Sequence, residues 1–378
     1  MNKIIALGDG NAAPEGFRGA ELAEIARTVL REHADEALQY GGRPGYLPLR
    51  RRVASWLNAE APSVNVDDLN IVTGAKQALD MAARALARPG DEVLLSQPTY
   101  MNALRIFGRA GVRPLVVSSD ERGTCVEQID QLLEDRARRG DRTPRLIYEI
   151  PDFHNPTGAV LSEERREQLV KLAMRYDIPI LEDNPYRWLR YEGLPARPLR
   201  AFDKTGVVIS VGTFAKILGP GIRLGWVHAR KDLLEKIMEF KADGGSSPLV
   251  QMVVYEFFRE DDALDLNLNR LRELLRAKRD VMLRALERSL RGAATWTTPS
   301  GGYYVWVRSV LPMDEVAVKT ASARAGVEYY PGSAFYPDPV AGRDSLRLCF
   351  AHETMPRIEQ GVSALGAIIS SSAAASVA

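Results

Sequence analysis

Residues 207–228, VVISVGTFAKILGPGIRLGWVH, place an apolar run on each side of a loop that contains Gly212, Thr213, Lys216 and Arg223. The runs at 207–211 and 223–228 are apolar enough to form strands buried on both faces. From residue 70 onward, short β-branched runs of this kind alternate with longer segments of helical period. This alternation predicts an α/β fold, with a largely parallel sheet and crossover helices on its faces.

The large domain is predicted to contain a mostly parallel, seven-stranded sheet, with strands at 70–73, 92–95, 114–117, 146–150, 179–182, 207–211 and 223–228. The intervening helices include 75–86, 127–139 and 162–176, and the last of these begins with a capping pattern at Ser162. Beyond Pro248 a long charged helix is expected at 263–290, followed by a smaller α+β domain. We therefore predict a cofactor-binding domain of residues 41–262. Residues 1–40 are expected to form an N-terminal arm and residues 263–378 the small domain. Helix 20–33 of the arm is expected to join the small domain.

The composition is that of an average globular protein. The chain has 378 residues, 46% of them hydrophobic and 26% charged, with a formal net charge of +1. This composition argues against a disordered or membrane-embedded protein. A net charge of +1 also argues against nucleic-acid binding, which needs a strongly positive surface. Two cysteines cannot build a disulfide framework, so a cytoplasmic protein is expected. The four histidines are scattered, and no metal site is predicted.

Chemically useful residues follow the predicted strands. In an open parallel sheet, ligands bind beyond the carboxyl ends of the strands. Taken singly, these residues have ordinary explanations, because many turns contain Gly and loop lysines are usually solvated. Together they supply a phosphate cradle at a helix start, an aromatic plate, an acid and an amine, which is the inventory that pyridoxal 5′-phosphate requires. The residues are Gly74, Ala75, Lys76, Tyr100, Asn155, Asp183, Tyr186, Thr213, Lys216 and Arg223.

Three roles follow from the chemistry of that cofactor. A carboxylate near the ring nitrogen favours its protonated form, and Asp183 fits this role. The aldehyde needs an amine that later moves a proton, and Lys216 fits that role. The phenolic oxygen of the ring accepts hydrogen bonds, which Asn155 and Tyr186 could donate.

Across nearly its whole length, the chain resembles the fold type I pyridoxal-phosphate-dependent aminotransferases of class I/II. It is most similar to the subgroup with aminoadipate and kynurenine aminotransferases and the effector domains of MocR-type regulators. Eight pieces carry the resemblance in order: LQYGGRPGYLPLR (38–50), TGAKQALD (73–80), QPTY (97–100), PDFHNPTG (151–158), EDNPYR (182–187), GTFAKILGPGIRLGW (212–226), PSGGYYVWV (299–307) and LRLCFA (346–351).

The resemblance implies a role for each matching residue. Lys216 carries the Schiff base, Asp183 pairs with the pyridinium nitrogen and Tyr100 stacks on the ring. Arg347 binds the substrate α-carboxylate, because a planar guanidinium can donate two parallel hydrogen bonds to a carboxylate. The resemblance also implies a homodimer with sites at the interface, in which Tyr40 reaches the phosphate of the other subunit. The remaining contacts are those of Asn155 and Tyr186 to the ring oxygen, and of Gly74, Ala75, Lys76, Thr213 and Arg223 to the phosphate.

Several positions depart from the pattern of the family. Ala75-Lys76 stands where Ser-Gln is usual, so Lys76 either reinforces phosphate binding or points to solvent. Ala215 replaces a frequent Ser before the lysine, and His154 replaces a Gln. The N-terminal segment also differs from the family pattern. Within it, Arg18 either recognises the substrate side chain or is an exposed arginine at a helix start. Phe17, Tyr329 and Tyr330 are candidates for lining the pocket.

The residues predict an aminotransferase that converts an α-amino acid to a 2-oxo acid, with the small-molecule amino acid as its partner. An alternative is an enzyme of natural-product biosynthesis that uses the same cofactor for elimination, γ-replacement, cyclisation or oxidation of an amino acid. A third hypothesis is a non-catalytic, cofactor-sensing module of a transcription regulator. The near-zero charge and the lack of a basic winged-helix segment before residue 10 argue against the third.

Overall fold

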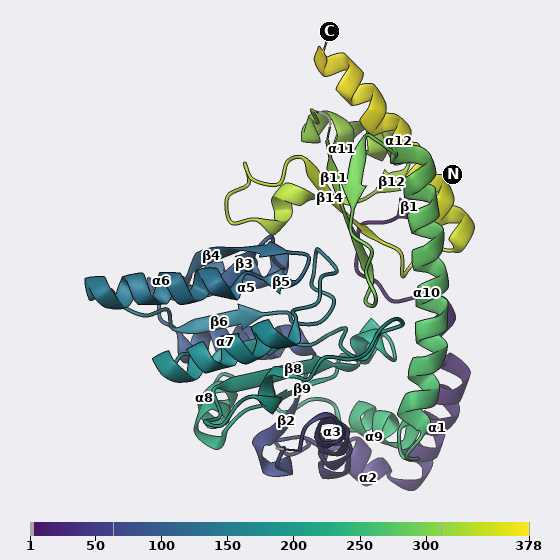
Figure 1. Ribbon diagram of the computed structural model, residues 1–378. Coiled ribbons are helices and arrows are strands. Elements are labelled where there is room, and N and C mark those ends of the chain that lie inside the picture. The colour runs from purple at the N-terminus through teal and green to yellow at the C-terminus, as the bar shows by residue number, and fades with distance from the viewer. Residues whose placement is uncertain (1–3, 63, 311, 378) are drawn as a thin grey trace.

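The computed structural model describes residues 4–62, 64–310 and 312–377. Its centre is a mixed sheet with the strand order β2-β9-β8-β7-β6-β3-β4-β5 (Figure 1). All seven predicted strands are present, but the predicted total of seven is wrong by one. The additional strand β5 has only two residues, too few for a periodic signal, and it pairs antiparallel with β4. The strands are β2 (Leu69–Val72), β3 (Glu92–Gln97), β4 (Arg113–Asp120), β5 (Gly123–Thr124), β6 (Leu146–Glu149), β7 (Ile180–Asp183), β8 (Val208–Thr213) and β9 (Gly225–His228).

The direction of the strands decides where the site can form. Strands β8, β7, β6, β3 and β4 are parallel neighbours, whereas β9 runs antiparallel to both β8 and β2. The carboxyl ends of the parallel strands and of β2 therefore lie at one edge of the sheet. All residues of β2, β6, β7, β8 and β9 are buried, as expected for strands covered on both faces.

Helices cover both faces of this sheet. On one face, apolar residues of α4 (Ala75–Leu86), α5 (Met101–Arg109) and α8 (Lys231–Glu239) share a core with the strands. On the other face, α6 (Val126–Arg139) and α7 (Glu163–Tyr176) do the same. The predicted cap of α7 is confirmed, because the Ser162 side chain accepts a hydrogen bond from the Arg165 N–H at 3.3 Å.

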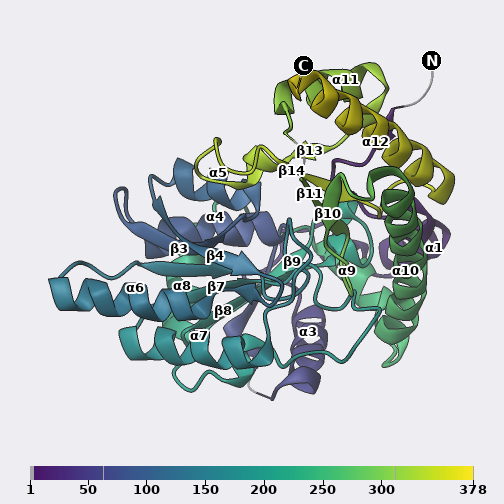
Figure 2. The same cartoon turned by 45° about the horizontal axis from the view of Figure 1, so that its top comes forward.

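A long helix, α10 (Ala263–Leu290), runs along the side of the molecule and leads to the smaller α+β part (Figure 1). That part contains a four-stranded sheet with the order β10 (Ala294–Trp296), β11 (Tyr304–Ser309), β14 (Ser345–Cys349) and β13 (Tyr330–Pro331). Strands β1 (Ile5–Ala6) and β12 (Val327–Glu328) form a parallel pair beside it. Helices α11 (Glu315–Arg324) and α12 (Met355–Val377) lie on the side away from the large sheet (Figure 2).

The first N-terminal helix lies elsewhere than predicted. Helix α1 (Gly19–Glu32) was expected to join the small domain, but it packs against α9 (Pro248–Phe257), next to α2 (Ala34–Ala37) and α3 (Leu47–Glu60). The reason is an apolar stripe on α1, in which Val29 meets Met252 and Val253 of α9. Of the helices in the described ranges, none combines the length and the apolar character that crossing a membrane would require.

Candidate active site

A cavity of about 360 Å³ lies where the carboxyl ends of the large sheet face the small sheet. Every residue predicted to bind the cofactor or the substrate contributes to its lining, except Tyr40 and Arg18. From the large sheet and its loops these are Gly74, Ala75, Lys76, Tyr100, Asn155, Asp183, Tyr186, Thr213, Lys216 and Arg223, and from the small sheet Arg347. Residues far apart in sequence therefore converge as the strand-end argument predicts.

Tyr40 and Arg18 lie outside this cavity. The Tyr40 side chain is 86% exposed and lies beside Gly244. Arg18 stands at the start of α1, where it pairs with Glu21 and lies 6.0 Å from the centre of the Phe257 ring. Arg18 therefore lies at a helix start, which was one of its two predicted positions, and it does not line the cavity of its own chain. Of the other pocket candidates, the cavity is lined by Tyr330 but not by Phe17 or Tyr329.

Asp183, the last residue of β7, is buried with one oxygen unpaired. Its Oδ2 accepts a hydrogen bond from the Tyr148 hydroxyl at 2.8 Å, while Oδ1 has no partner among the described residues. Burial raises the pKa of Asp183 to about 6, although Tyr148 and Lys216 both act to lower it. A buried carboxylate oxygen without a donor is costly. The protonated ring nitrogen of pyridoxal phosphate is a donor of the kind that this oxygen lacks, so the residues fit the cofactor.

Lys216 lies in a 3-10 turn, Phe214–Lys216, directly after β8. Its Nζ donates to the Gly10 carbonyl at 2.6 Å, and its own carbonyl accepts a hydrogen bond from the Tyr303 hydroxyl at 3.1 Å. Desolvation lowers the pKa of Lys216 to about 8, and the positive charges of Arg347 and Lys76 act in the same direction. Much more of this amine is therefore neutral near pH 7 than of an ordinary lysine, as a nucleophile requires.

The start of α4 forms an anion-binding cradle. Gly74 at its N-cap has φ +88°, and the free N–H groups of the first turn point out of the helix end. Gly225 permits the close approach of β9, because a Cβ there would lie 2.5 Å from the Gly212 carbonyl oxygen and 3.1 Å from the Ala75 nitrogen. Arg223 adds a cation, held by a 3.2 Å hydrogen bond from Nη2 to the Thr73 carbonyl. These groups suit a phosphate.

The Thr213 hydroxyl lies beside this cradle, where it donates to the Leu224 carbonyl and accepts from the Ala215 N–H, each at 3.2 Å. Lys76 is exposed at the cavity, in the first turn of α4. Its positive charge acts, after burial and Arg347, to lower the pKa of Lys216.

Arg347 supplies a buried cation from β14. Its Nη1 donates to Asn155 Oδ1 at 2.8 Å and its Nη2 to the Gly8 carbonyl at 2.6 Å, while Nε has no partner among the described residues. The guanidinium lies 4.1 Å from the centre of the Tyr304 ring and 4.9 Å from that of Tyr330. A buried cation with an unused donor is a suitable partner for a carboxylate.

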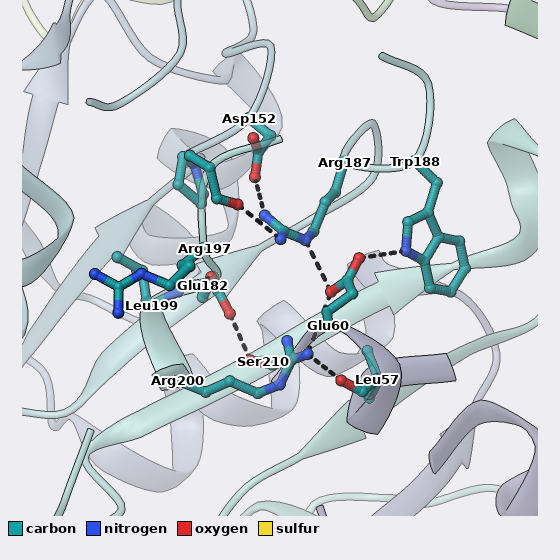
Figure 3. Close-up of polar contacts among 12 residues, drawn as sticks. Leu57, Glu60, Asp152, Glu182, Arg187, Trp188, Arg197, Leu199, Arg200 and Ser210 are labelled. Carbon is teal, nitrogen blue, oxygen red and sulfur yellow. Dashed lines mark hydrogen bonds and ion pairs between the residues drawn. The ribbon is translucent and has the colours of Figure 1, made fainter. Parts of the chain in front are cut away.

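A buried ion-pair network, shown in Figure 3, holds the loops behind the cavity. Arg187 bridges Asp152, at 2.8 Å, and Glu60 of α3, at 2.9 Å. Asp152 also accepts from Arg166 at 2.9 Å and from Arg190 at 3.3 Å. Although burial opposes its ionisation, these arginines hold the pKa of Asp152 at about 2. The network thereby ties the loop that contains Asn155 to the loop that contains Tyr186.

Sequence reasoning missed two tyrosines that complete the site. Tyr148 lies inside β6, one residue before the end of the strand, and the strand-end argument assigns it no role. Its hydroxyl directly after the aliphatic Leu146 and Ile147 was the available signal, because a buried Tyr hydroxyl needs a partner. Tyr304 belongs to the quoted piece PSGGYYVWV, but no role was assigned to it; its hydroxyl lies 2.9 Å from that of Tyr186. The lining also includes Asp9, Gly10, Asn11, Leu79, Met101, Asn102, Arg105, Ile150, Pro185, Ala215 and Pro220.

Comparison with known proteins agrees with this geometry. The family model described as "Aminotransferase class I and II" matches residues 2–365. Aromatic-amino-acid aminotransferase 1 of Thermococcus litoralis is 35% identical over 97% of this chain and 88% of its own length. The 2-aminoadipate transaminase of Thermus thermophilus is 34% identical over 96% of this chain and 89% of its own length. The crystal structure of a multiple substrate aminotransferase from Thermococcus profundus superimposes with a TM-score of 0.92 at 34% identity, covering 98% of this chain and 92% of that one.

These matches confirm the predicted resemblance, the fold type I architecture and pyridoxal phosphate as the cofactor. The chain belongs to the class I and II aminotransferases, pyridoxal-phosphate-dependent transferases that act on amino acids.

Proposed function

We propose that Lys216, Asp183 and Tyr186 carry the transamination of an α-amino acid to its 2-oxo acid in this cavity. The observation that carries the proposal is the unpaired, buried Oδ1 of Asp183, in the same cavity as a lysine whose pKa is lowered to about 8. The Asp183 carboxylate lacks a hydrogen-bond donor, and Lys216 is a nucleophilic amine. Pyridoxal phosphate satisfies both at once, because it has a basic ring nitrogen and an aldehyde.

The bound cofactor supplies an aldehyde that takes up amines and a ring that draws electrons from the substrate α-carbon. Asp183 keeps a proton on the ring nitrogen, and Tyr148 holds the Asp183 carboxylate in place. The Lys216 amine would accept the proton from the α-carbon and later return it. Arg347 binds the α-carboxylate and thereby orients the α-hydrogen toward Lys216.

The remaining site residues position the cofactor. Tyr100 would pack against the ring, and Asn155 and Tyr186 would donate hydrogen bonds to the ring oxygen. Because Asn155 Oδ1 already accepts from Arg347 at 2.8 Å, its amide NH₂ is available for this contact. The phosphate is held by Gly74, Ala75, Lys76, Thr213 and Arg223.

We further propose that the functional unit is a homodimer with two sites at its interface. Tyr40 supports this, because it is 86% exposed, beside a 70% exposed Leu38, and it lies outside the cavity of its own chain. Its hydroxyl would then bind the phosphate in the partner subunit. Residues 41–262 would form the cofactor-binding domain, and residues 1–40 and 263–378 the arm and small domain.

The proposed setting is the cytoplasm, where two free thiols persist. The proposed partner is a small amino acid, with no part for nucleic acid or membrane. The relatives are named for different substrates, among them aromatic amino acids and 2-aminoadipate. A panel of donors from both classes is therefore the appropriate first screen.

The attachment of the cofactor tests the assignment of Lys216. Borohydride reduction of the protein with bound pyridoxal phosphate, followed by peptide mass analysis, should place the label on Lys216. Lys216→Ala should abolish both the label and the absorbance of the bound cofactor, whereas the matched Lys76→Ala should keep both. Retention of the label in Lys216→Ala would show that Lys76 or another lysine is the attachment point and would overturn the proposal.

A further inference from the structure

The hydroxyl of Tyr304 has no part in the reaction described above, although it lies inside the cavity. Tyr304 is the first residue of β11 and is only 3% exposed. Its hydroxyl oxygen is 2.9 Å from that of Tyr186, and the two rings meet edge to face with centroids 5.6 Å apart. Both hydroxyls therefore belong to one buried pair at the wall of the site.

The position of this hydroxyl is fixed from several directions. A Cβ on Gly10 would lie 2.0 Å from the Tyr304 oxygen, so the chain passes directly over it. The Arg347 guanidinium covers the face of the ring at 4.1 Å. Tyr304 thus has little freedom to turn its hydroxyl away from Tyr186.

The direction of the hydrogen bond follows from counting protons. A tyrosine hydroxyl has one hydrogen to donate and lone pairs to accept with. If Tyr186 gives its hydrogen to the ring oxygen of the cofactor, only its lone pairs remain for Tyr304. Tyr304 must then donate to Tyr186, and two hydrogen bonds in series strengthen each other.

We propose that Tyr304 is a positioning residue, whose hydroxyl donates to Tyr186 and thereby stabilises negative charge on the ring oxygen of the bound cofactor. The inference rests on the proposed role of Tyr186. It has a consequence that can be measured without substrate. When the nitrogen that joins the cofactor to Lys216 loses its proton, negative charge remains on the ring oxygen, and the relay through Tyr186 stabilises that charge. Tyr304 therefore lowers the pH at which this proton is lost.

The test is a pH titration of the absorbance of the bound cofactor in the wild type and in Tyr304→Phe. The variant should titrate at a pH higher by roughly 0.3 to 0.7 units, the effect of losing one neutral hydrogen bond in a chain of two. Tyr186→Phe should raise the midpoint further, and adding Tyr304→Phe to it should produce no additional shift. Tyr329→Phe is the matched control: it removes a hydroxyl from another buried tyrosine, which does not line the cavity, and should leave the midpoint unchanged.

Three outcomes would overturn the inference. One is an unchanged midpoint in Tyr304→Phe, and another is a shift of equal size in the Tyr186→Phe background. The third is a shift of equal size in Tyr329→Phe, which would indicate a general effect of removing hydroxyls. If the wild type binds pyridoxal phosphate without any absorbance that titrates and depends on Lys216, the proposed function itself fails. That result is distinct from a failure of the role of Tyr304 alone.

Discussion

Replacement of Asp152 by Asn perturbs the buried network that holds the two cofactor-binding loops together. The carboxylate lies within 3.3 Å of Arg166, Arg187 and Arg190, and its side chain is 2% exposed. Asn has nearly the same shape, so the change removes the charge and little volume. It leaves three largely buried guanidinium groups with less compensation, and Glu60 remains as the carboxylate paired with Arg187, which also donates to the Ala196 carbonyl at 3.0 Å.

The size of the effect follows from the pKa of Asp152. Its decrease from the ordinary 3.8 to about 2 corresponds to about 2.5 kcal/mol of stability, at about 1.36 kcal/mol per pKa unit. Removing one partner of a buried ion pair costs about 3 to 5 kcal/mol in other proteins. We therefore expect Asp152→Asn to lower the free energy of unfolding at pH 7 by about 2 to 5 kcal/mol.

Urea unfolding at several pH values measures this loss. A carboxyl whose pKa is lowered on folding contributes stability that is fully present above its unfolded pKa and is lost as pH falls through its folded pKa. The difference between wild type and Asp152→Asn should therefore be constant above about pH 4 to 5 and shrink toward pH 2.

Asp261→Asn is the matched control, because Asp261 is fully exposed in its 2.7 Å pair with Arg52. It should lower the free energy of unfolding far less than Asp152→Asn does, because solvent screens an exposed ion pair. If Asp152→Asn cost no more than this control, or if its effect did not decrease in acid, the network would not have the energetic role inferred from its geometry.

The remaining predictions concern the cavity itself. Because the pKa of Lys216 is lowered to about 8, the rate at which the apoprotein captures pyridoxal phosphate should rise with pH to a midpoint near 8; a midpoint near the ordinary 10.5 would contradict this. Tyr148→Phe should raise the pKa of Asp183 further, since it removes the hydroxyl that donates to the carboxylate, and should reduce turnover several-fold with the cofactor still bound; unchanged turnover would argue against the role of Tyr148. Gly225→Ala should weaken the affinity for the cofactor, measured by equilibrium dialysis, because the added Cβ would lie 2.5 Å from the Gly212 carbonyl oxygen. Gly221→Ala is the control and should bind the cofactor normally, because a Cβ at Gly221 meets nothing within 4 Å. Equal affinities of the two Gly variants would refute the close-approach explanation.

Much of the fold could be predicted because strand and helix periods are strong local signals. Helices α4 and α10 occur at the predicted residues, and the seven longer strands lie within a few residues of their predicted positions. The cavity was predictable for a related reason, since the strand ends alone bring Lys216, Asp183 and Asn155 to one edge.

The errors have physical causes of a different kind. The position of α1 depends on whether its apolar face meets α9 or the small sheet, and the periodicity of α1 is the same in both cases. Arg18, at the start of α1, lies outside the cavity of its own chain for the same reason. The roles of Tyr148 and Tyr304 depend on partners that lie 35 and 118 residues away in sequence, so a local pattern can flag a buried hydroxyl but cannot identify its partner.

A single-turnover reaction without oxygen tests transamination most directly. The purified protein with bound pyridoxal phosphate would be mixed with one amino acid at a time, with mass analysis of both cofactor and product. Transamination predicts stoichiometric conversion of the cofactor to pyridoxamine phosphate together with a 2-oxo acid. A modified amino acid, formed while the cofactor keeps its aldehyde, would show that the same residues perform elimination, replacement or cyclisation and would contradict the proposed reaction.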